Sequence, residues 1–302
     1  MLKSVEKMIK DIAADHRSGA SFLMQKAMDC LIVFAREAQS LTIGSFRKDL
    51  QEAADKLVEA QPDMVPLLTL THDILCAVKA AVEQRYSVEE GCHVIKERVK
   101  IFSERLRDAD KKIAAAGLAL IQDGEIILTH SYSSSVRKLL ESLHRMGRAI
   151  RVIATESRPG YEGRRLAKEL GSQGIPTTLI VDAAALKLLE RAQRVVIGAD
   201  RVADTYFVNK TGTLALLLGA QHAKKDVVIV SDTTKFFKGE HAAVDSKQHP
   251  KEEVWREKHP NVSVENPYFE AIPLVLVNHL LCDQGLMTPD RIFPYVIKGG
   301  LF

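Results

Sequence analysis

Residues 122–135 read QDGEIILTHSYSSS, and the character of the chain changes within this stretch. The pair Asp123-Gly124 is typical of a turn, and the run Glu125–Thr129 that follows has the length and composition of a short buried strand. Small hydroxyl residues then lead directly into a helical pattern. We therefore expect helices before this stretch and alternating strands and helices after it.

The chain before this stretch has the apolar spacing of helices. Apolar residues recur at helical intervals from Val5 to about Ala116. The position of Ser87 three residues before Glu90 predicts a capping box at the start of a long helix. Breaks between helices are expected near Arg17-Ser18-Gly19, Leu41-Thr42-Ile43-Gly44, Gln61-Pro62-Asp63 and Tyr86-Ser87.

The chain after this stretch alternates between short strand patterns and helical patterns. The helical patterns include Ser135–Met146 and Gly163–Leu170. Such alternation predicts an α/β fold, with a helical N-terminal domain (1–122) followed by a parallel-sheet domain (123–302) covered by helices on both faces. The expected strands are Glu125–Thr129, Ile150–Thr155, Thr177–Val181, Arg194–Gly198, Asp226–Ser231 and Leu274–Asn278.

The composition excludes several classes of protein. Lys and Arg total 42 against 39 Asp and Glu, so we expect no direct binding of nucleic acid. Charged residues interrupt the N-terminus, and no stretch reads as long and apolar enough to span a bilayer, so neither a signal peptide nor a membrane is expected. The four cysteines form no CxxC pair, which argues against a metal site or disulfides and favours the reducing cytoplasm.

Polar residues follow the first two expected strands. Ligands of open parallel sheets bind beyond the carboxyl ends of the strands. Ser131, Ser133 and Ser134 precede a helix there, and hydroxyl groups with free N–H groups at a helix start suit an anion. Helix capping alone explains such serines equally well. Arg158 follows the next strand and offers a forked cation to a phosphate, although one arginine in a turn is more often a surface residue.

Two further strand ends carry charge. Asp200 follows the fourth strand, where a buried carboxylate acts as an acid or base or simply caps a loop. Asn209 and Lys210 lie in a segment expected to open a helix. Neither GxGxxG nor GxxxxGK[ST] occurs, so no nucleotide cofactor is expected and a small phosphate ester is the favoured ligand.

Five motifs occur in an order that resembles one superfamily. They are Ile127-Leu128-Thr129-His130-Ser131, Ala154-Thr155-Glu156-Ser157-Arg158-Pro159, Val181-Asp182-Ala183-Ala184, Ile197-Gly198-Ala199-Asp200 and Asn209-Lys210-Thr211-Gly212-Thr213. Together they are similar to the α, β and δ regulatory subunits of eukaryotic translation initiation factor 2B, methylthioribose-1-phosphate isomerase and ribose-1,5-bisphosphate isomerase. The resemblance implies a helical N-terminal domain, a Rossmann-like C-terminal domain and a two-fold dimer. Outside these motifs the match is weaker.

The resemblance also implies roles for single residues. The isomerases have a catalytic cysteine directly after Thr-His, where this chain has Ser131, and a catalytic aspartate at the position of Asp200. Arg17 lies in a segment loosely similar to the Arg-Gly-Ala of the isomerases. A serine without an activating base is a far weaker acid than a thiol, so Ser131 argues against catalysis.

Three functions remain open at this point. The first is a regulatory sugar-phosphate-binding protein similar to the initiation factor α subunit, motivated by Ser131. The second is an aldose–ketose isomerase acting on a ribose phosphate, motivated by Asp200 together with Arg158 and Lys210. The third is a scaffold with a vestigial pocket, which leaves the polar strand ends unexplained.

The expected ligand is a phosphorylated ribose or a nucleotide-derived sugar phosphate, bound without a cofactor. A homodimer or a larger assembly with related subunits is expected from the resemblance. The apolar residues taken to support the dimer are Phe236, Phe237, Phe269 and Leu286. The residues expected to face one cavity are Ser133, Ser134, Arg158, Asp200, Asn209 and Lys210, with Arg17 approaching from the helical domain.

Overall fold

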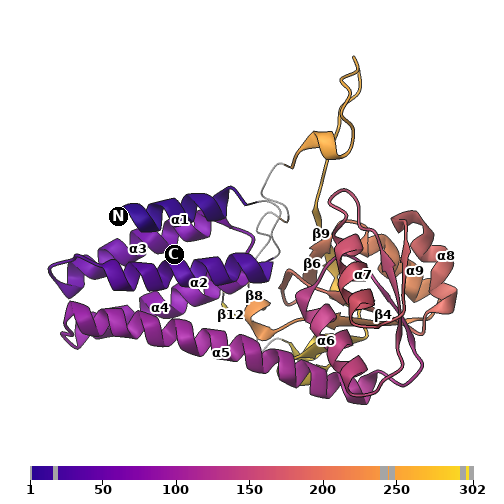
Figure 1. The fold of residues 1–302 in the computed structure, drawn as a ribbon, viewed down its shortest axis with the longest axis horizontal. Coiled ribbons are helices and arrows are strands. Elements are labelled where there is room, and N and C mark those ends of the chain that lie inside the picture. Colours follow the sequence, from indigo (N-terminus) through magenta and orange to yellow (C-terminus); the bar gives the residue numbers. More distant parts are fainter. Residues whose placement is uncertain (1, 16–19, 239–243, 245–248, 293–296, 299–302) are drawn as a thin grey trace. The chain divides into compact units, whose positions relative to one another are not determined.

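The computed structural model describes residues 2–15, 20–238, 244, 249–292 and 297–298 (Figure 1). The chain divides into two compact units between Arg107 and Asp108, inside the long helix α5 (Val88–Leu120). The chain changes from helix to strand near residue 122, as expected. The division into two domains at that residue stays a prediction.

The first unit consists of helices where the apolar spacing predicts them. The capping box at α5 is confirmed, because Glu90 N–H donates to Ser87 Oγ at 3.1 Å and Ser87 N–H donates to Glu90 Oε2 at 2.7 Å. The helices before α5 are α1 (Lys3–Ala13), α2 (Ala20–Glu37), α3 (Ile43–Ala60) and α4 (Val65–Glu83).

Helix α4 departs from one expectation. By length and composition alone it is apolar enough to cross a bilayer, so the expectation that no stretch qualifies is wrong for this segment. Its side chains Leu67, Leu70 and Ile74 are fully buried in the core of the helical unit. This is the ordinary position of a core helix, and the test remains weak evidence for a membrane span.

The second unit is built on a seven-stranded sheet of order β11-β10-β7-β4-β1-β2-β3. Neighbouring strands are parallel except for β11, which is antiparallel to β10. The strands are β1 (Ile126–Thr129), β2 (Arg151–Thr155), β3 (Thr177–Ile180), β4 (Arg194–Gly198), β7 (Asp226–Val230), β10 (His279–Cys282) and β11 (Gly285–Met287).

Successive residues of the strands face opposite layers of helices. Ile127 packs in a core with α6 (Ser134–Arg145), α7 (Glu162–Ser172) and the end of α5, whereas its neighbour Leu128 packs in a core with α8 (Ala185–Leu188) and α9 (Thr213–His222). This alternation follows from the two-residue period of a strand. The expected α/β fold, with a mostly parallel sheet between helices, is confirmed.

Two segments differ from the expectation. The strand expected at 274–278 is instead the 3-10 turn η5 (Leu274–Leu276), because the chain leaves a small antiparallel sheet at β9 (Phe269–Pro273) and enters the main sheet at β10. The segment expected to open a helix at Asn209 is strand β6 (Tyr206–Lys210), which pairs with β9 and with β5 (Arg201–Val202). Asn209 and Lys210 therefore end a strand.

The strand order identifies the position of a site. Going along the chain, β1, β2 and β3 extend the sheet in one direction, and β4, β7 and β10 extend it in the other. The direction reverses between β1 and β4, and ligands of open α/β sheets bind at this reversal, outside the carboxyl ends of the strands.

Candidate functional site

The loops after β1 and β4 approach each other closely at the point of reversal. A Cβ on Gly198, the last residue of β4, would lie 2.4 Å from both Cβ and Oγ of Ser133. Ser133 is the N-cap of α6, and its hydroxyl accepts a hydrogen bond from Val136 N–H at 3.3 Å. Glycine at position 198 therefore allows the start of α6 to lie directly beside the segment that carries Asp200.

Ser131 and Ser157 both have left-handed backbone conformations, with φ of 66° and 62°. Positive φ is uncommon for serine, and such strained residues cluster at functional sites. The two residues contact each other, since Ser131 N–H donates to Ser157 Oγ at 2.8 Å. The ends of β1 and β2 are therefore held in one fixed arrangement.

His130 connects these loops to the loop after β6. Its Nδ1 lies 2.6 Å from Thr155 Oγ1, and its Nε2 lies 3.0 Å from the carbonyl oxygen of Thr211. Burial lowers the pKa of His130, although the Thr211 hydrogen bond opposes the shift. A neutral ring that donates from Nε2 and accepts at Nδ1 satisfies both contacts.

The β2 loop is held by a carboxylate at the end of β3. Asp182 accepts hydrogen bonds from the N–H groups of Ser157 and Arg158, each at 2.7 Å. The exposed Arg158 side chain donates from Nη1 to Tyr161 Oη and from Nη2 to the Glu253 carbonyl oxygen at 3.0 Å. Its guanidinium is thus positioned beyond the carboxyl ends of the strands.

Asp200 is surrounded by charged side chains. Burial raises the pKa of its carboxyl, and the cations Lys235, Lys210 and Arg201 lower it without overcoming that effect. Lys235, in the 3-10 turn η3 (Thr233–Lys235) after β7, donates from Nζ to the Ala199 carbonyl oxygen at 2.9 Å. A carboxyl with a raised pKa beside ammonium groups can donate or accept a proton.

Lys210 is almost fully buried, with 3% of its side chain exposed, and forms an ion pair with Glu162. The distance from Lys210 Nζ to Glu162 Oε1 is 2.8 Å. The other carboxylate oxygen, Glu162 Oε2, is buried and has no hydrogen-bond partner among the described residues. An unpartnered buried oxygen is costly and marks a place where a ligand donor fits.

The amino end of α9 is already occupied by a carboxylate. Glu270 Oε1 accepts hydrogen bonds from Gly212 N–H and Leu214 N–H, each at 2.8 Å. Asn209 is buried and donates from Nδ2 to Thr213 Oγ1 at 3.0 Å. At this loop Glu270 thus satisfies the N–H groups of Gly212 and Leu214, and Lys210 supplies the positive charge.

The expected site residues are gathered to different degrees. Lys210 and Asp200 interact electrostatically, and Ser133 lies beside the end of β4. Ser131 and Ser134 lie in the β1–α6 segment, and Arg158 is on the adjacent β2 loop. Arg17 lies outside the described residues.

Sequence reasoning missed Glu162, Lys235 and His130. Glu162 lies on a helix rather than at a strand end, and Lys235 belongs to a short turn with no motif. His130 belongs to the motif Ile127-Leu128-Thr129-His130-Ser131, which by itself assigns the histidine no role. Its position directly after a strand was the available signal.

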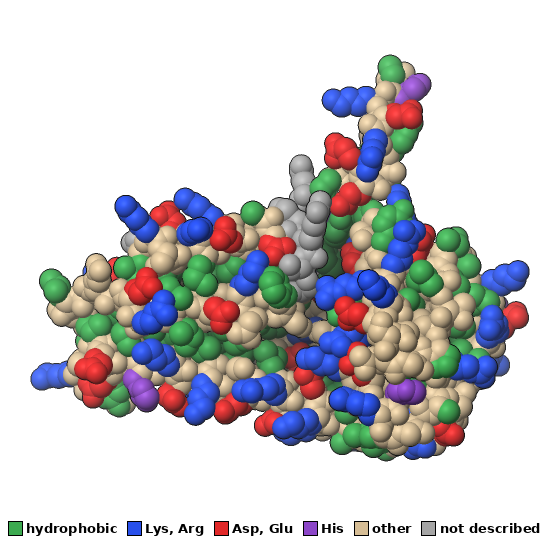
Figure 2. Space-filling view, in the orientation of Figure 1, with side chains coloured by type: hydrophobic (Ala, Val, Ile, Leu, Met, Phe, Trp, Pro, Cys, Tyr) green, Lys and Arg blue, Asp and Glu red, His purple; other side chains and the backbone are tan. Residues whose placement is uncertain are grey.

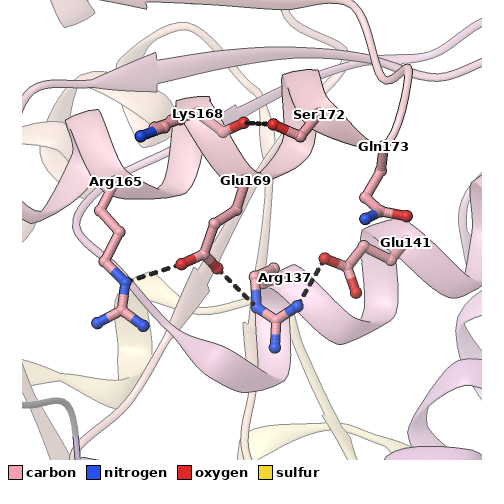
Figure 3. Close-up of a pocket in the computed structure, with 7 residues that line it drawn as sticks. All are labelled: Arg137, Glu141, Arg165, Lys168, Glu169, Ser172 and Gln173. Carbon is pink, nitrogen blue, oxygen red and sulfur yellow. Dashed lines mark hydrogen bonds and ion pairs between the residues drawn. The ribbon is translucent and has the colours of Figure 1, made fainter.

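A surface hollow of about 370 Å³ is lined by residues of α6 and α7 and by Gln173 (Figure 3). Its charged side chains pair with one another, with Arg137 contacting Glu141 at 2.6 Å and Glu169 at 3.2 Å. Tyr132 Oη also donates to Glu169. This network braces the two helices and leaves the strand ends as the candidate site. The lining residues are Arg137, Glu141, Arg165, Lys168, Glu169, Ser172 and Gln173.

No cluster of three or more His, Cys, Asp or Glu side chains suited to a metal ion occurs within the described residues.

Comparison with known proteins gives a consistent result. The family model described as "Initiation factor 2 subunit family" matches residues 16–289. A translation initiation factor eIF-2B subunit 2-like protein of Pyrococcus furiosus is 30% identical, covering 96% of this chain and 98% of the relative. A ribose 1,5-bisphosphate isomerase of Thermococcus kodakarensis is 28% identical, covering 96% and 92%. The crystal structure of translation initiation factor eIF-2B from Pyrococcus horikoshii OT3 superposes with a TM-score of 0.80 at 27% identity, covering 96% and 99%.

Proposed function

The chain belongs to the initiation factor 2 subunit family, and from this premise we propose that its strand-end site binds a phosphorylated ribose and serves a regulatory role. The relatives carry names of both kinds, initiation factor subunit and ribose 1,5-bisphosphate isomerase. The shared element of the proposal is a sugar phosphate held at the reversal point of the sheet.

One observation carries the proposal. Two ammonium groups, Lys210 and Lys235, interact electrostatically with Asp200, which follows β4 at the point where the strand order reverses. Ammonium groups suit phosphate oxygens, whereas a carboxyl group suits a sugar hydroxyl. Arg158 adds a guanidinium from the adjacent β2 loop.

Calorimetric titration with ribose 1,5-bisphosphate, ribose 5-phosphate and unphosphorylated ribose tests this binding. We expect the phosphorylated sugars to bind and ribose not to bind. Lys210→Ala should weaken binding by about 1.5–3 kcal/mol, the range for a hydrogen bond to a charged group. The matched control Lys187→Ala removes an exposed lysine of α8 and should leave the affinity unchanged. Unchanged affinity in both Arg158→Ala and Lys210→Ala would overturn the pocket.

The second candidate is an aldose–ketose isomerase, favoured by the raised pKa of Asp200. Moving a carbon-bound proton between neighbouring carbons requires a group that alternates between acid and base. Ser131 stands where the isomerases have cysteine, which favours binding without turnover. Incubation with ribose 1,5-bisphosphate or methylthioribose-1-phosphate, followed by NMR, detects any ketose. Turnover that Asp200→Asn abolishes while largely preserving affinity would select the enzyme.

The proposal extends to the setting of the protein. A regulatory role of this kind requires contact with related subunits, so we place the chain in a homodimer or a larger assembly in the cytoplasm. Sedimentation of the purified chain with and without candidate subunits tests this assembly.

A further inference from the structure

A segment of the sheet unit projects away from the strands next to the site. Residues 254–265, which we call the arm, contain no helix or strand and extend as the orange projection in Figure 1. The arm carries both charged and apolar side chains on its surface (Figure 2). Val254, Trp255 and Val262 are 43%, 38% and 47% exposed. Trp255 is the one tryptophan in the sequence.

The two ends of the arm are fastened together by a group of residues that we call the neck: Pro250, Glu253, Asn266 and Tyr268. Asn266 Nδ2 donates to the Pro250 carbonyl oxygen at 2.7 Å and to Glu253 Oε2 at 3.0 Å. Tyr268 Oη donates to the same carboxylate oxygen, Glu253 Oε2. These contacts close the base of the arm.

The neck is also held by the cations of the candidate site. Arg158 Nη2 donates to the Glu253 carbonyl oxygen at 3.0 Å. Lys210 Nζ lies 3.8 Å from the centroid of the Tyr268 ring, a cation–π contact. Thr211, the next residue, donates from its backbone N–H to the Tyr268 carbonyl oxygen at 2.9 Å. Both proposed phosphate-binding cations therefore contact the neck, Arg158 at Glu253 and Lys210 at Tyr268.

We propose that the neck senses occupancy of the site, so that a phosphate ester bound by Arg158 and Lys210 loosens the neck and frees the arm. This inference rests on the proposed function. At the neck the Arg158 guanidinium contacts a carbonyl oxygen and the Lys210 ammonium contacts an aromatic face, neither of which carries a net charge, and Lys210 also pairs with Glu162. A phosphate carries net negative charge, so it attracts both cations more strongly than the uncharged neck groups do. The ligand thus competes with the neck for the same two side chains.

Coupling of this kind is reciprocal. If the ligand loosens the neck, a loosened neck must bind the ligand more tightly by the same factor. Asn266→Ala removes two neck hydrogen bonds without changing Arg158 or Lys210. We expect this variant to bind ribose 5-phosphate about fivefold more tightly than the wild type, the lower end of typical coupling. Val262→Ser changes an exposed arm residue outside the neck and is the matched control.

The experiment follows the arm and the site separately on the full chain. Tryptic cleavage after Arg256 and Lys258, identified by mass spectrometry, and Trp255 fluorescence report on the arm, while calorimetry reports binding. Saturating ribose 5-phosphate should raise the cleavage rate about fivefold and change the fluorescence. Concentrated inorganic phosphate should have the same effect, and ribose should have none.

The outcomes separate the two proposals. If calorimetry shows binding while cleavage and fluorescence stay unchanged, the coupling is overturned and the binding function stands. Slower cleavage on binding has the same meaning. Absence of binding by any ribose phosphate overturns the proposed function, and the coupling fails with it. Tighter binding by Asn266→Ala but not by Val262→Ser, together with faster cleavage on binding, supports the coupling.

Discussion

Glu162 competes with any phosphate for Lys210. Its Oε1 pairs with the ammonium at 2.8 Å, and its Oε2 is buried without a partner among the described residues. The carboxylate therefore holds the Lys210 ammonium in place and, under the proposed function, repels an incoming phosphate. Which of the two effects matters more can be decided by substitution.

Glu162→Gln should bind ribose phosphates about tenfold more tightly, or about 1.4 kcal/mol, because the neutral amide neither repels the phosphate nor retains the ammonium as strongly. Titration calorimetry measures the change. Glu156→Gln is the matched control, since Glu156 directly follows β2 and pairs with Arg164 at 2.6 Å instead of with Lys210. Weaker binding by Glu162→Gln would mean that the carboxylate contacts the sugar instead.

Asp200 makes stability depend on pH. Because burial raises its pKa, the folded chain retains a proton that the unfolded chain releases above about pH 4. The contribution of Asp200 to stability is therefore lost as the pH rises from there through the folded-state pKa. Asparagine stays neutral, so Asp200→Asn should melt at a higher temperature than the wild type at pH 7, with the difference vanishing near pH 4.

Scanning calorimetry between pH 4 and pH 8 checks this difference. Asp204→Asn, which changes an exposed carboxylate of the same segment, should show no such trend. A lower melting temperature for Asp200→Asn at pH 7 would mean that its attraction to Lys235 and Lys210 outweighs the cost of burial.

At the scale of elements, helix α7 touches the end of β2 without room for a side chain. A Cβ on Gly163 would lie 1.8 Å from the Thr155 carbonyl oxygen. The close approach keeps Glu162, the residue before it, in reach of Lys210. The packing of one helix against one strand thus positions an ion pair of the site.

Gly163→Ala should lower the free energy of unfolding by about 3 kcal/mol, because the helix and the strand must separate to admit the methyl group. It should also weaken ligand binding. Chemical denaturation measures the first effect and calorimetry the second. Gly171→Ala, in the same helix with no atom within 4 Å of the added Cβ, should instead stabilise the chain by about 0.5–1 kcal/mol. Equal effects of the two substitutions would contradict this account.

The sheet could be anticipated from local patterns, and the site only in part. The turn at Asp123-Gly124 and the strand Arg194–Gly198 are legible because their signals lie within a few residues. Strand β6 could not be predicted in this way. Its residue Phe207 pairs with Ile272 of β9, which lies far along the chain, and the strand forms only through that pairing. Glu162 contacts Lys210 because helix α7 packs against the end of β2, and no sequence motif indicates this contact.

At the scale of the whole molecule, the expected dimer is the remaining question. Phe236 cannot contribute to an interface, because it is fully buried inside the subunit and packs in the core beneath the sheet. The expectation for this residue is therefore wrong. Leu286 is 44% exposed on the edge strand β11, and edge strands readily pair with another chain.

Light scattering should give twice the 33.5 kDa mass of one chain at micromolar concentration. Leu286→Arg should weaken this dimer, whereas Leu41→Arg, at a leucine 95% exposed in the helical unit, should not. A stable monomer in the wild type would reject the dimer, and equal behaviour of the two variants would exclude β11 from its interface.

The carboxylate of Glu270 at the start of α9 has a consequence for the evolution of such sites. In many nucleotide-binding folds the main chain itself cradles the phosphate, and a change of ligand requires a change of loop. At α9 Glu270 takes that position, and under the proposed function the phosphate is held by the side chains of Lys210, Lys235 and Arg158, which lie at a strand end, in a turn and in a loop. Single substitutions can then exchange one phosphate ester for another, or turnover for sensing, while the sheet is inherited unchanged.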